Sequence, residues 1–180
     1  MRKLKNEELG RMSVEEYRKS RKLPLVIVLD NIRSLNNIGS IFRTSDAFRI
    51  EEIHLCGITA QPPHREIHKT ALGATESVKW SYYTDSMESI RMLKEQNYSI
   101  LSLEQTDDSI LLNEFEPLEN TKYALILGNV VKGVDDKLID ISDFCIEIEQ
   151  VGTKHSFNVT VSAGIAIYDI ALKLNYLGLS

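Results

Sequence analysis

Two unbroken runs of apolar residues most constrain what this chain can fold into. Residues 25–29 read Leu-Val-Ile-Val-Leu and are followed at once by Asp30, and residues 123–127 read Tyr-Ala-Leu-Ile-Leu and are followed by Gly128. Short continuous runs rich in β-branched residues are typical of strands buried on both faces of a parallel sheet. Because parallel strands need crossover helices that cover the sheet, we predict an α/β fold with a mainly parallel sheet flanked by helices.

The segments around the two runs are typical of alternating strands and helices. Asn37 can cap a helix that runs through Phe48 with its apolar residues on one side, and a strand at 53–56 then completes a strand, helix, strand unit. The remaining predicted elements are an exposed-edge strand at 77–80, strands at 98–103 and 145–148, a helix at 87–96, a polar loop at 61–69 and a long, mostly buried helix from 156 to 174.

Length and composition predict one domain behind a short arm. With 180 residues, of which 43% are apolar, the chain can bury one good core. Cys56 and Cys145 lie in apolar runs and match no disulfide or zinc spacing, so we expect reduced core residues. The N-terminus has no apolar run long enough for a signal peptide or a membrane span, and we therefore expect a cytoplasmic protein without a membrane partner.

Charge is unevenly distributed in this chain, whose formal net charge is −5. Residues 1–22 contain eight lysines and arginines and four glutamates, a net charge of +4, so residues 23–180 carry −9. Ser13 and Glu16 have the spacing of a capping box, which predicts a short helix in this arm. We expect a basic helical arm at 1–22 and one domain at 23–180. The arm can bind nucleic-acid phosphates, or it can be a solvated helix held by charge pairs.

Polar and glycine residues follow or flank apolar runs in three places, and α/β proteins bind ligands at the carboxyl ends of their strands. The first place, residues 37–44, combines Asn37, Gly39 and Arg43 at a helix start. Free backbone N–H groups and a planar cation there suit an anion such as phosphate. An ordinary asparagine cap with a surface arginine explains the same residues.

The other two places are residues 127–133 and 152–158. The first contains glycines without Rossmann or P-loop spacing, so it can let a flat cofactor approach the backbone or form a plain turn. In the second, Ser156 can cap the last helix, and Asn158, which we expect to be buried in the first turn, needs a hydrogen-bond partner.

Two other kinds of site are disfavoured by the sequence. His64 and His68 are four residues apart, but no third zinc ligand is evident. No Gly-x-Ser-x-Gly elbow occurs, which disfavours a serine hydrolase.

Together the three places resemble a known family. Asn-x-Gly-x-x-x-Arg-Thr at 37–44, Leu-Gly-Asn at 127–129 and Ser-Phe-Asn-Val at 156–159 are similar, in order and separation, to the three motifs of the TrmH/SpoU family of RNA 2′-O-ribose methyltransferases, within the SPOUT superfamily. The resemblance runs from about 25 to about 174. It implies a sheet with a C-terminal trefoil knot, S-adenosylmethionine as cofactor, a homodimer with its active site at the subunit boundary, and tRNA or rRNA as the partner.

The resemblance also implies roles for residues. The implied catalytic residues are Asn37, Arg43, Ser156 and Asn158. The implied cofactor-binding residues are Leu127, Gly128, Asn129, Ile148, Gln150, Ser156 and Phe157. We expect RNA contacts from Arg2, Lys3, Lys5, Arg11 and Arg43. No metal is implied.

The predicted chemistry is transfer of a methyl group to a ribose 2′-hydroxyl of structured RNA. The enzyme must align the 2′-oxygen and ease removal of its proton. Arg43 matches the arginine to which the family assigns hydroxyl activation. Because a guanidinium is a poor general base, stabilising the developing alkoxide or positioning a phosphate is physically easier. Asn37 would orient Arg43 or the ribose, and Ser156 and Asn158 would fix the cofactor loop and the target nucleotide.

Two departures from the family pattern leave a second function open. Val130 stands where the second motif usually has a glutamate, and Glu149 and Gln150 replace the usual Pro-Met before the third motif. The alternative prediction is a catalytically impaired or silent relative that acts as an RNA-binding protein. Methylation of a small molecule or a protein is a third possibility, which the basic arm disfavours.

Overall fold

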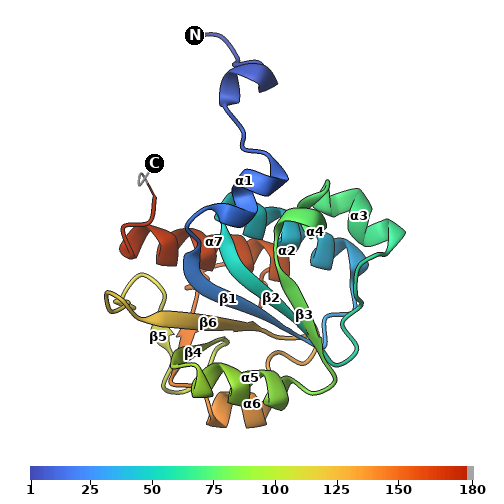
Figure 1. Cartoon of the computed structure of the whole chain (residues 1–180). Coiled ribbons are helices and arrows are strands. Elements are labelled where there is room, and N and C mark those ends of the chain that lie inside the picture. Colours follow the sequence, from blue (N-terminus) through green and yellow to red (C-terminus); the bar gives the residue numbers. More distant parts are fainter. Residues whose placement is uncertain (178–180) are drawn as a thin grey trace.

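The computed structural model describes residues 1–177 and contains a seven-stranded sheet in which neighbouring strands are parallel. The strand order is β3-β2-β1-β6-β4-β7-β5 (Figure 1). The predicted parallel α/β sheet is therefore confirmed, whereas the trefoil knot stays a prediction. The strands are β1 (Leu23–Asp30), β2 (Ile50–Cys56), β3 (Trp80–Tyr83), β4 (Tyr98–Leu103), β5 (Ile110–Leu111), β6 (Lys122–Leu127) and β7 (Phe144–Glu147).

Helices cover both faces of the sheet. Figure 1 shows α5 and α6 below the sheet and α2, α3, α4 and α7 above it. A short 3-10 helix, η1 (Asn6–Leu9), precedes the α-helices, which are α1 (Val14–Lys19), α2 (Leu35–Ala47), α3 (Arg65–Ala71), α4 (Ala74–Ser77), α5 (Ser86–Glu95), α6 (Asp136–Asp140) and α7 (Val159–Lys173).

The central strand β1 is buried on both faces, as its sequence predicts. Leu25, Ile27 and Leu29 belong to the core cluster on the α2 and α7 side. Val26 and Val28 belong to a second cluster with side chains of α5 and α6. Because successive side chains of a strand point to opposite faces, one apolar run supplies both cores.

The start of α2 differs from the prediction. Ser34, not Asn37, is the N-cap, and its hydroxyl accepts a hydrogen bond from the Asn37 backbone N–H at 3.3 Å. Asn37 therefore lies in the first helical turn. Serine is as favourable as asparagine at an N-cap position. Ser34 precedes Asn37 in the chain, and the helix begins directly after it.

Two predictions near the sheet edge are also wrong in part. The polar loop at 61–69 becomes helical at Arg65, because α3 buries Ile67 and Ala71 against the body of the protein. The predicted strand at 77–80 begins only at Trp80, since Ser77 belongs to α4. Its predicted edge position is correct.

The last helix is less buried than predicted. Ala163, Ala166 and Ile170 are buried, whereas other apolar side chains, including Tyr168 at 53% exposure, face solvent. One apolar side of α7 covers the sheet, and the apolar side chains on the opposite side stay largely exposed, although the Tyr168 ring makes an edge-to-face contact with Phe48.

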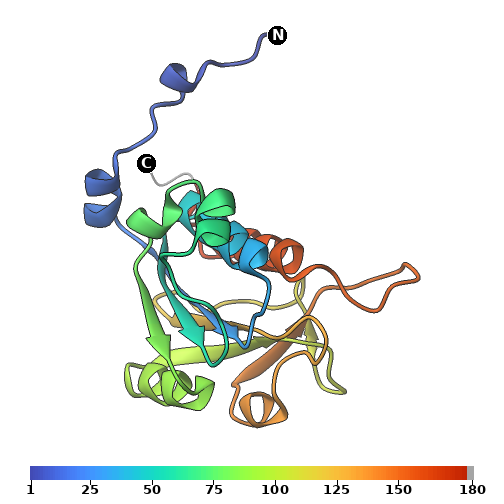
Figure 2. The same ribbon diagram turned by 90° about the vertical axis from the view of Figure 1, so that its right-hand side faces the viewer.

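The N-terminal arm is attached through α1. Ser13 forms the predicted capping box with Glu16, and Tyr17 is buried at 3% exposure. The Arg18 guanidinium donates to the backbone oxygen of Glu76 at 2.6 Å. The chain before α1 extends away from the body (Figure 2).

The cysteines are free and in environments that suppress thiolate formation. Burial raises the pKa of the Cys56 thiol to about 12 and also raises the pKa of the half-buried Cys145. The prediction of a core residue with a free thiol is confirmed for Cys56, whereas Cys145 is only half-buried and belongs to neither core cluster. Among the described helices, none has the length and apolar character needed to span a membrane.

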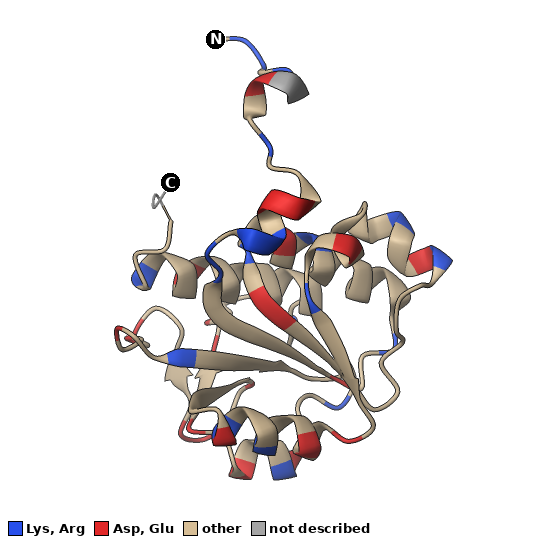
Figure 3. Cartoon of the chain, in the orientation of Figure 1, with Lys and Arg blue, Asp and Glu red and all other residues tan. Residues whose placement is uncertain are grey.

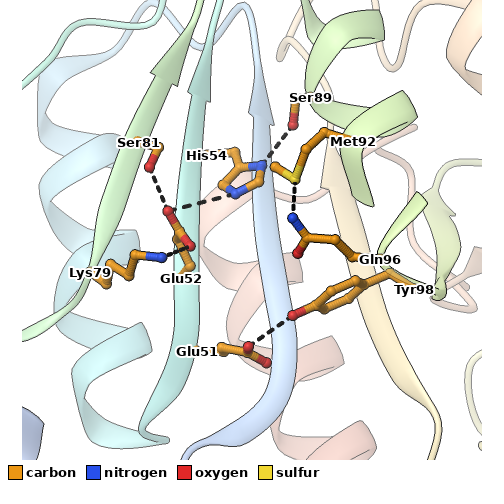
Figure 4. A network of polar contacts seen from close by, with 9 residues as sticks. All are labelled: Glu51, Glu52, His54, Lys79, Ser81, Ser89, Met92, Gln96 and Tyr98. Atoms are coloured by element: carbon orange, nitrogen blue, oxygen red, sulfur yellow. Dashed lines mark hydrogen bonds and ion pairs between the residues drawn. The ribbon is translucent and has the colours of Figure 1, made fainter. Parts of the chain in front are cut away.

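A polar network joins β2, β3 and α5 (Figure 4). The Glu52 carboxylate accepts from Lys79 Nζ at 2.7 Å and from Ser81 Oγ at 2.5 Å. The buried His54 ring lies between Glu52, 3.8 Å from Nε2, and Ser89 Oγ, 2.7 Å from Nδ1. These contacts connect strands at the edge of the sheet to the helix below it.

Candidate functional site

A cavity of about 470 Å³ opens at the carboxyl ends of β4, β6 and β7. It is lined by residues 103–105 at the end of β4, by residues 127–134 at the end of β6, and by parts of α6, of the chain between β7 and α7, and of the start of α7. A cavity of this size is typical of small-molecule and cofactor sites. The sequence places polar and glycine residues at strand ends, and parallel pairing brings those ends together.

The expected cofactor residues all line this cavity. They come from two segments separated in sequence, the end of β6 and the chain between β7 and α7: Leu127, Gly128, Asn129, Ile148, Gln150, Ser156 and Phe157. Figure 2 shows the chain before α7 extending away from the sheet beside α7. Its exposed residues, from Val151 to Asn158, leave one side of the cavity open to solvent.

The turn after β6 is closed by its own backbone. Asn129 and Gly133 exchange two N–H to O=C hydrogen bonds, of 2.9 and 2.7 Å. A Cβ on Gly128 would overlap backbone atoms of Gly133 and Val134, so only glycine permits this close approach. Gly133 has a φ of +71°, which also favours glycine. The two glycines therefore shape the cavity wall through backbone geometry.

Asn129 fixes the turn from within. Its side-chain oxygen accepts from the backbone N–H groups of Val131 and Lys132, at 2.9 and 3.4 Å. Its Nδ2 donates to the backbone oxygen of Asn31, just after β1, at 2.9 Å. One amide thus joins the cavity wall to the segment that leads into α2.

Glu104 also lines this cavity, although it was not among the residues predicted from the sequence. Its two carboxylate oxygens accept from the backbone N–H groups of Gln105 and Val134, each at 3.0 Å. The carboxylate therefore ties the end of β4 to the turn after β6. The position of Glu104 directly after the predicted strand at 98–103 was a usable signal. Val130, which is 54% exposed, is not needed to hold the turn closed.

The cavity has an excess of negative charge. Glu104, Asp136 and Glu147 line it together with one cationic side chain, Lys132, and His155. A ligand that carries a localised positive charge is favoured there, because opposite charges at a partly enclosed site attract more strongly than in open water.

Comparison with known proteins identifies the family. The sequence model of the SpoU rRNA Methylase family matches residues 24–168. The chain belongs to this family.

Individual relatives agree with the family assignment. The chain is 32% identical over 159 residues to an uncharacterized tRNA/rRNA methyltransferase of Borreliella burgdorferi, covering 88% of this chain and 68% of that protein. It is 27% identical over 163 residues to the tRNA (guanosine(18)-2′-O)-methyltransferase of Thermus thermophilus, covering 90% and 81%.

A solved structure shares the fold. The AdoMet-bound rRNA methyltransferase of Sinorhizobium meliloti matches with a TM-score of 0.79 at 21% identity, over 88% of this chain and 60% of that chain. This SpoU family protein thus spans about three fifths of that methyltransferase.

Three residues expected to act in catalysis do not line the cavity. Asn37 and the exposed Arg43 lie on α2, and Asn158 is the N-cap of α7. The Asn158 side-chain oxygen accepts from the Thr160 backbone N–H at 2.9 Å. The expectation that Asn158 is a buried amide in the first turn, with Ser156 as the cap, is therefore wrong. Ser156 is exposed and lines the cavity instead.

Four of the five cations expected to contact RNA lie on the N-terminal stretch of this SpoU family chain, and the fifth, Arg43, lies on α2. Arg2, Lys3, Lys5 and Arg11 are exposed, at a distance from the mixed charges of the body (Figure 3). Arg2 pairs with Glu8 at 2.6 Å. Hydrogen bonding to Glu8 raises the Arg2 pKa, and it lowers the pKa of Glu8.

No group of three or more His, Cys, Asp or Glu residues within 1–177 could hold a metal ion.

Proposed function

We propose that this protein transfers a methyl group from S-adenosylmethionine to a ribose 2′-hydroxyl of a structured tRNA or rRNA. The observation that carries the proposal is the match of residues 24–168 to the SpoU rRNA Methylase family. The cavity formed by the second and third motifs supports it. A tRNA 2′-O-methyltransferase and an uncharacterized tRNA/rRNA methyltransferase among the similar proteins agree with it.

The cavity fits the proposed cofactor in size and charge. The carboxylates of Glu104, Asp136 and Glu147 favour the positive charge of a sulfonium. Gly128 and Gly133 line the cavity, and the turn keeps its shape because neither position has room for a side chain. Leu127, Ile148 and Phe157 supply apolar wall.

For this reaction the chain must position the ribose 2′-oxygen and stabilise the negative charge that develops on it. When bound, S-adenosylmethionine supplies an activated methyl group. The chain holds the ribose so that its 2′-oxygen is aligned for attack. Arg43 stabilises the negative charge that develops on this oxygen, or holds a phosphate that takes part in proton transfer. Asn37 orients Arg43 or the ribose, and Ser156 and Asn158 hold the cofactor loop and the target nucleotide.

The working form that we propose is a homodimer. Arg43 and Asn37 do not line the cavity, so an active site at the boundary of two copies would bring them to it from the partner. The exposed apolar residues of α7 support such a boundary: Val161, Ile165, Tyr168 and Leu172. The arm at 1–22 would bind RNA phosphates next to the domain at 23–180, and action on RNA favours a cytoplasmic location.

The test is methyl transfer from labelled S-adenosylmethionine to bulk RNA of cells that lack the protein, read by nucleoside mass spectrometry. Arg43→Ala is expected to abolish a single 2′-O-methylated nucleoside while folding stays nearly intact. Arg91→Ala is the matched control, because Arg91 is an exposed arginine on α5, on the other face of the sheet. Full activity of Arg43→Ala would contradict the role given to Arg43.

A second candidate function is RNA binding without catalysis. Val130 favours it, since valine cannot accept the hydrogen bonds of the family's usual glutamate at that position. Val130→Glu separates the two. A large gain in turnover indicates a weakened enzyme, and no turnover in either form, with intact RNA binding, favours a binding protein.

A further inference from the structure

A second open hollow, of about 520 Å³, lies between α3, α4 and the start of β3. No residue lines both this hollow and the cofactor cavity. Nothing in the proposed methyl transfer uses it. The hollow is lined in part by Pro62, Pro63, His64, Arg65, His68 and Trp80.

Ring side chains form part of the wall of the hollow. Trp80 is half-buried and packs partly against the main core, so its indole is held in place while it lines the hollow. Pro62 and Pro63 face the same space and have few internal degrees of freedom. Aromatic faces of this kind are surfaces on which unpaired bases stack.

Hydrogen-bonding groups at the hollow are available. Among residues 1–177, no hydrogen bond or ion pair engages the Trp80 indole N–H, the Arg65 guanidinium or the His68 ring with another described residue. Glu76 also lines the hollow and adds an acceptor, because Arg18 bonds its backbone oxygen rather than its carboxylate. A planar ligand with donors and acceptors on its edge, such as a nucleobase, matches this set.

The hollow is held close to α2. Thr70 of α3 donates its hydroxyl hydrogen to the Asn36 backbone oxygen at 3.1 Å, and Gly39 lets the α3 backbone approach α2 closely. Arg43 follows Gly39 by four residues and therefore lies on the same side of α2. An RNA strand that crosses α3 thus reaches the helix that carries Arg43.

We propose that the hollow binds one unpaired nucleobase of the RNA substrate, outside the nucleotide that is methylated. This inference rests on the proposed function in that the substrate is RNA. The base stacks against Trp80, its edge bonds to His68 and Glu76, and Arg65 contacts the adjoining phosphate. Recognition of unstacked bases is the usual way in which proteins read single-stranded parts of RNA.

The chain offers a direct reporter, because Trp80 is its single tryptophan. The full-length protein is titrated with bulk tRNA and with single-stranded octamers of A, C and U, and Trp80 fluorescence is followed. Saturable quenching at the RNA concentrations that give binding in a filter assay is expected. The double variant Arg65→Ala/His68→Ala should weaken RNA binding about tenfold and reduce the quenching, whereas Arg91→Ala should change neither.

Several results would overturn the proposal. RNA that binds saturably without changing Trp80 fluorescence would show that RNA avoids the hollow. Quenching that is undiminished in the double variant would place its origin elsewhere. Fluorescence that changes with protein concentration alone would mean that a second copy covers the hollow. Affinity for S-adenosylhomocysteine should be unchanged in the double variant, and its loss would indicate a structural effect.

The test separates this inference from the proposed function. Quenching by RNA in a protein that transfers no methyl group would uphold the nucleobase site and contradict the enzyme. Methyl transfer to RNA without quenching would uphold the enzyme and contradict the nucleobase site. Absence of any RNA binding would contradict both.

Discussion

The Glu52 carboxylate is predicted to make stability depend on pH in the acid range. Burial of Glu52 acts to raise its pKa, but His54, Lys79 and Ser81 together outweigh burial and lower the pKa from 4.5 to about 2 (Figure 4). Its side chain is 12% exposed, so solvent screens these contacts only partly. The folded protein therefore favours the ionised carboxylate.

The sign and the size of this pH dependence follow from the linkage between proton binding and folding. A carboxyl group whose pKa is lowered on folding stabilises the protein above its unfolded pKa, and this contribution is lost as the pH falls toward the folded pKa. The difference between 4.5 and about 2 corresponds to about 3 kcal/mol, of which about 2 kcal/mol is lost by pH 3. The charged form of Glu52 thus stabilises the fold at neutral pH, and this stabilisation fades between about pH 5 and pH 2.

The perturbation is Glu52→Gln, and the assay is urea unfolding at pH values from 7 to 3. Wild-type protein should lose about 2 kcal/mol more of its unfolding free energy than Glu52→Gln over this range. Glu95→Gln is the control, because Glu95 is an exposed glutamate on α5 without an ion pair among the described residues. Parallel pH curves for wild type and Glu52→Gln would refute the reasoning, whatever their offset at pH 7.

Three other perturbations test the site, the packing of α3 and the arm. Gly128→Ala should weaken S-adenosylhomocysteine binding at least tenfold in calorimetry, because a Cβ would overlap the backbone of the turn after β6. Gly152→Ala is the control, since a Cβ there lies in open space, and equal affinities of the two variants would contradict the role of the turn. Gly39→Ala should lower the unfolding free energy by about 1–3 kcal/mol because its Cβ would overlap the α3 backbone. Gly164→Ala is the control and should not lower it, and equal urea midpoints of the two variants would contradict the close approach of α3. Deletion of residues 2–12, which spares the capping box of α1, should reduce RNA affinity and flatten its salt dependence, with cofactor affinity unchanged; equal losses of both affinities would make the arm structural.

The sequence predicted most strands because burial on two faces leaves a simple pattern. The runs at 25–29 and 123–127 lie within β1 and β6, which are neighbours in the sheet. The strand at 98–103 has the predicted bounds. Shorter elements with mixed patterns escaped prediction. The two-residue strand β5 and the helix α3 depend on contacts with distant parts of the chain, which no local window records.

The candidate site was predictable in its glycines and amides but not in its assembly. Gly128, Asn129 and Ser156 follow or precede apolar runs, and parallel pairing alone brings such strand ends together. The sequence did not reveal that Glu104 would bond to the turn after β6, because the partners are backbone groups of another strand end. It also did not reveal that Ser34 would cap α2 in place of Asn37.

The sequence by itself determined the α/β class, the parallel strands and the family, because these depend on local hydrophobic pattern and on motifs that stay recognisable wherever the chain runs. Tertiary structure alone decided which side of α7 is covered, that Arg43 lies outside the cavity lining, and that Trp80 and α3 enclose a second hollow. Those features depend on how closely distant elements approach, as at Gly39, and that distance is set by packing rather than by any one segment.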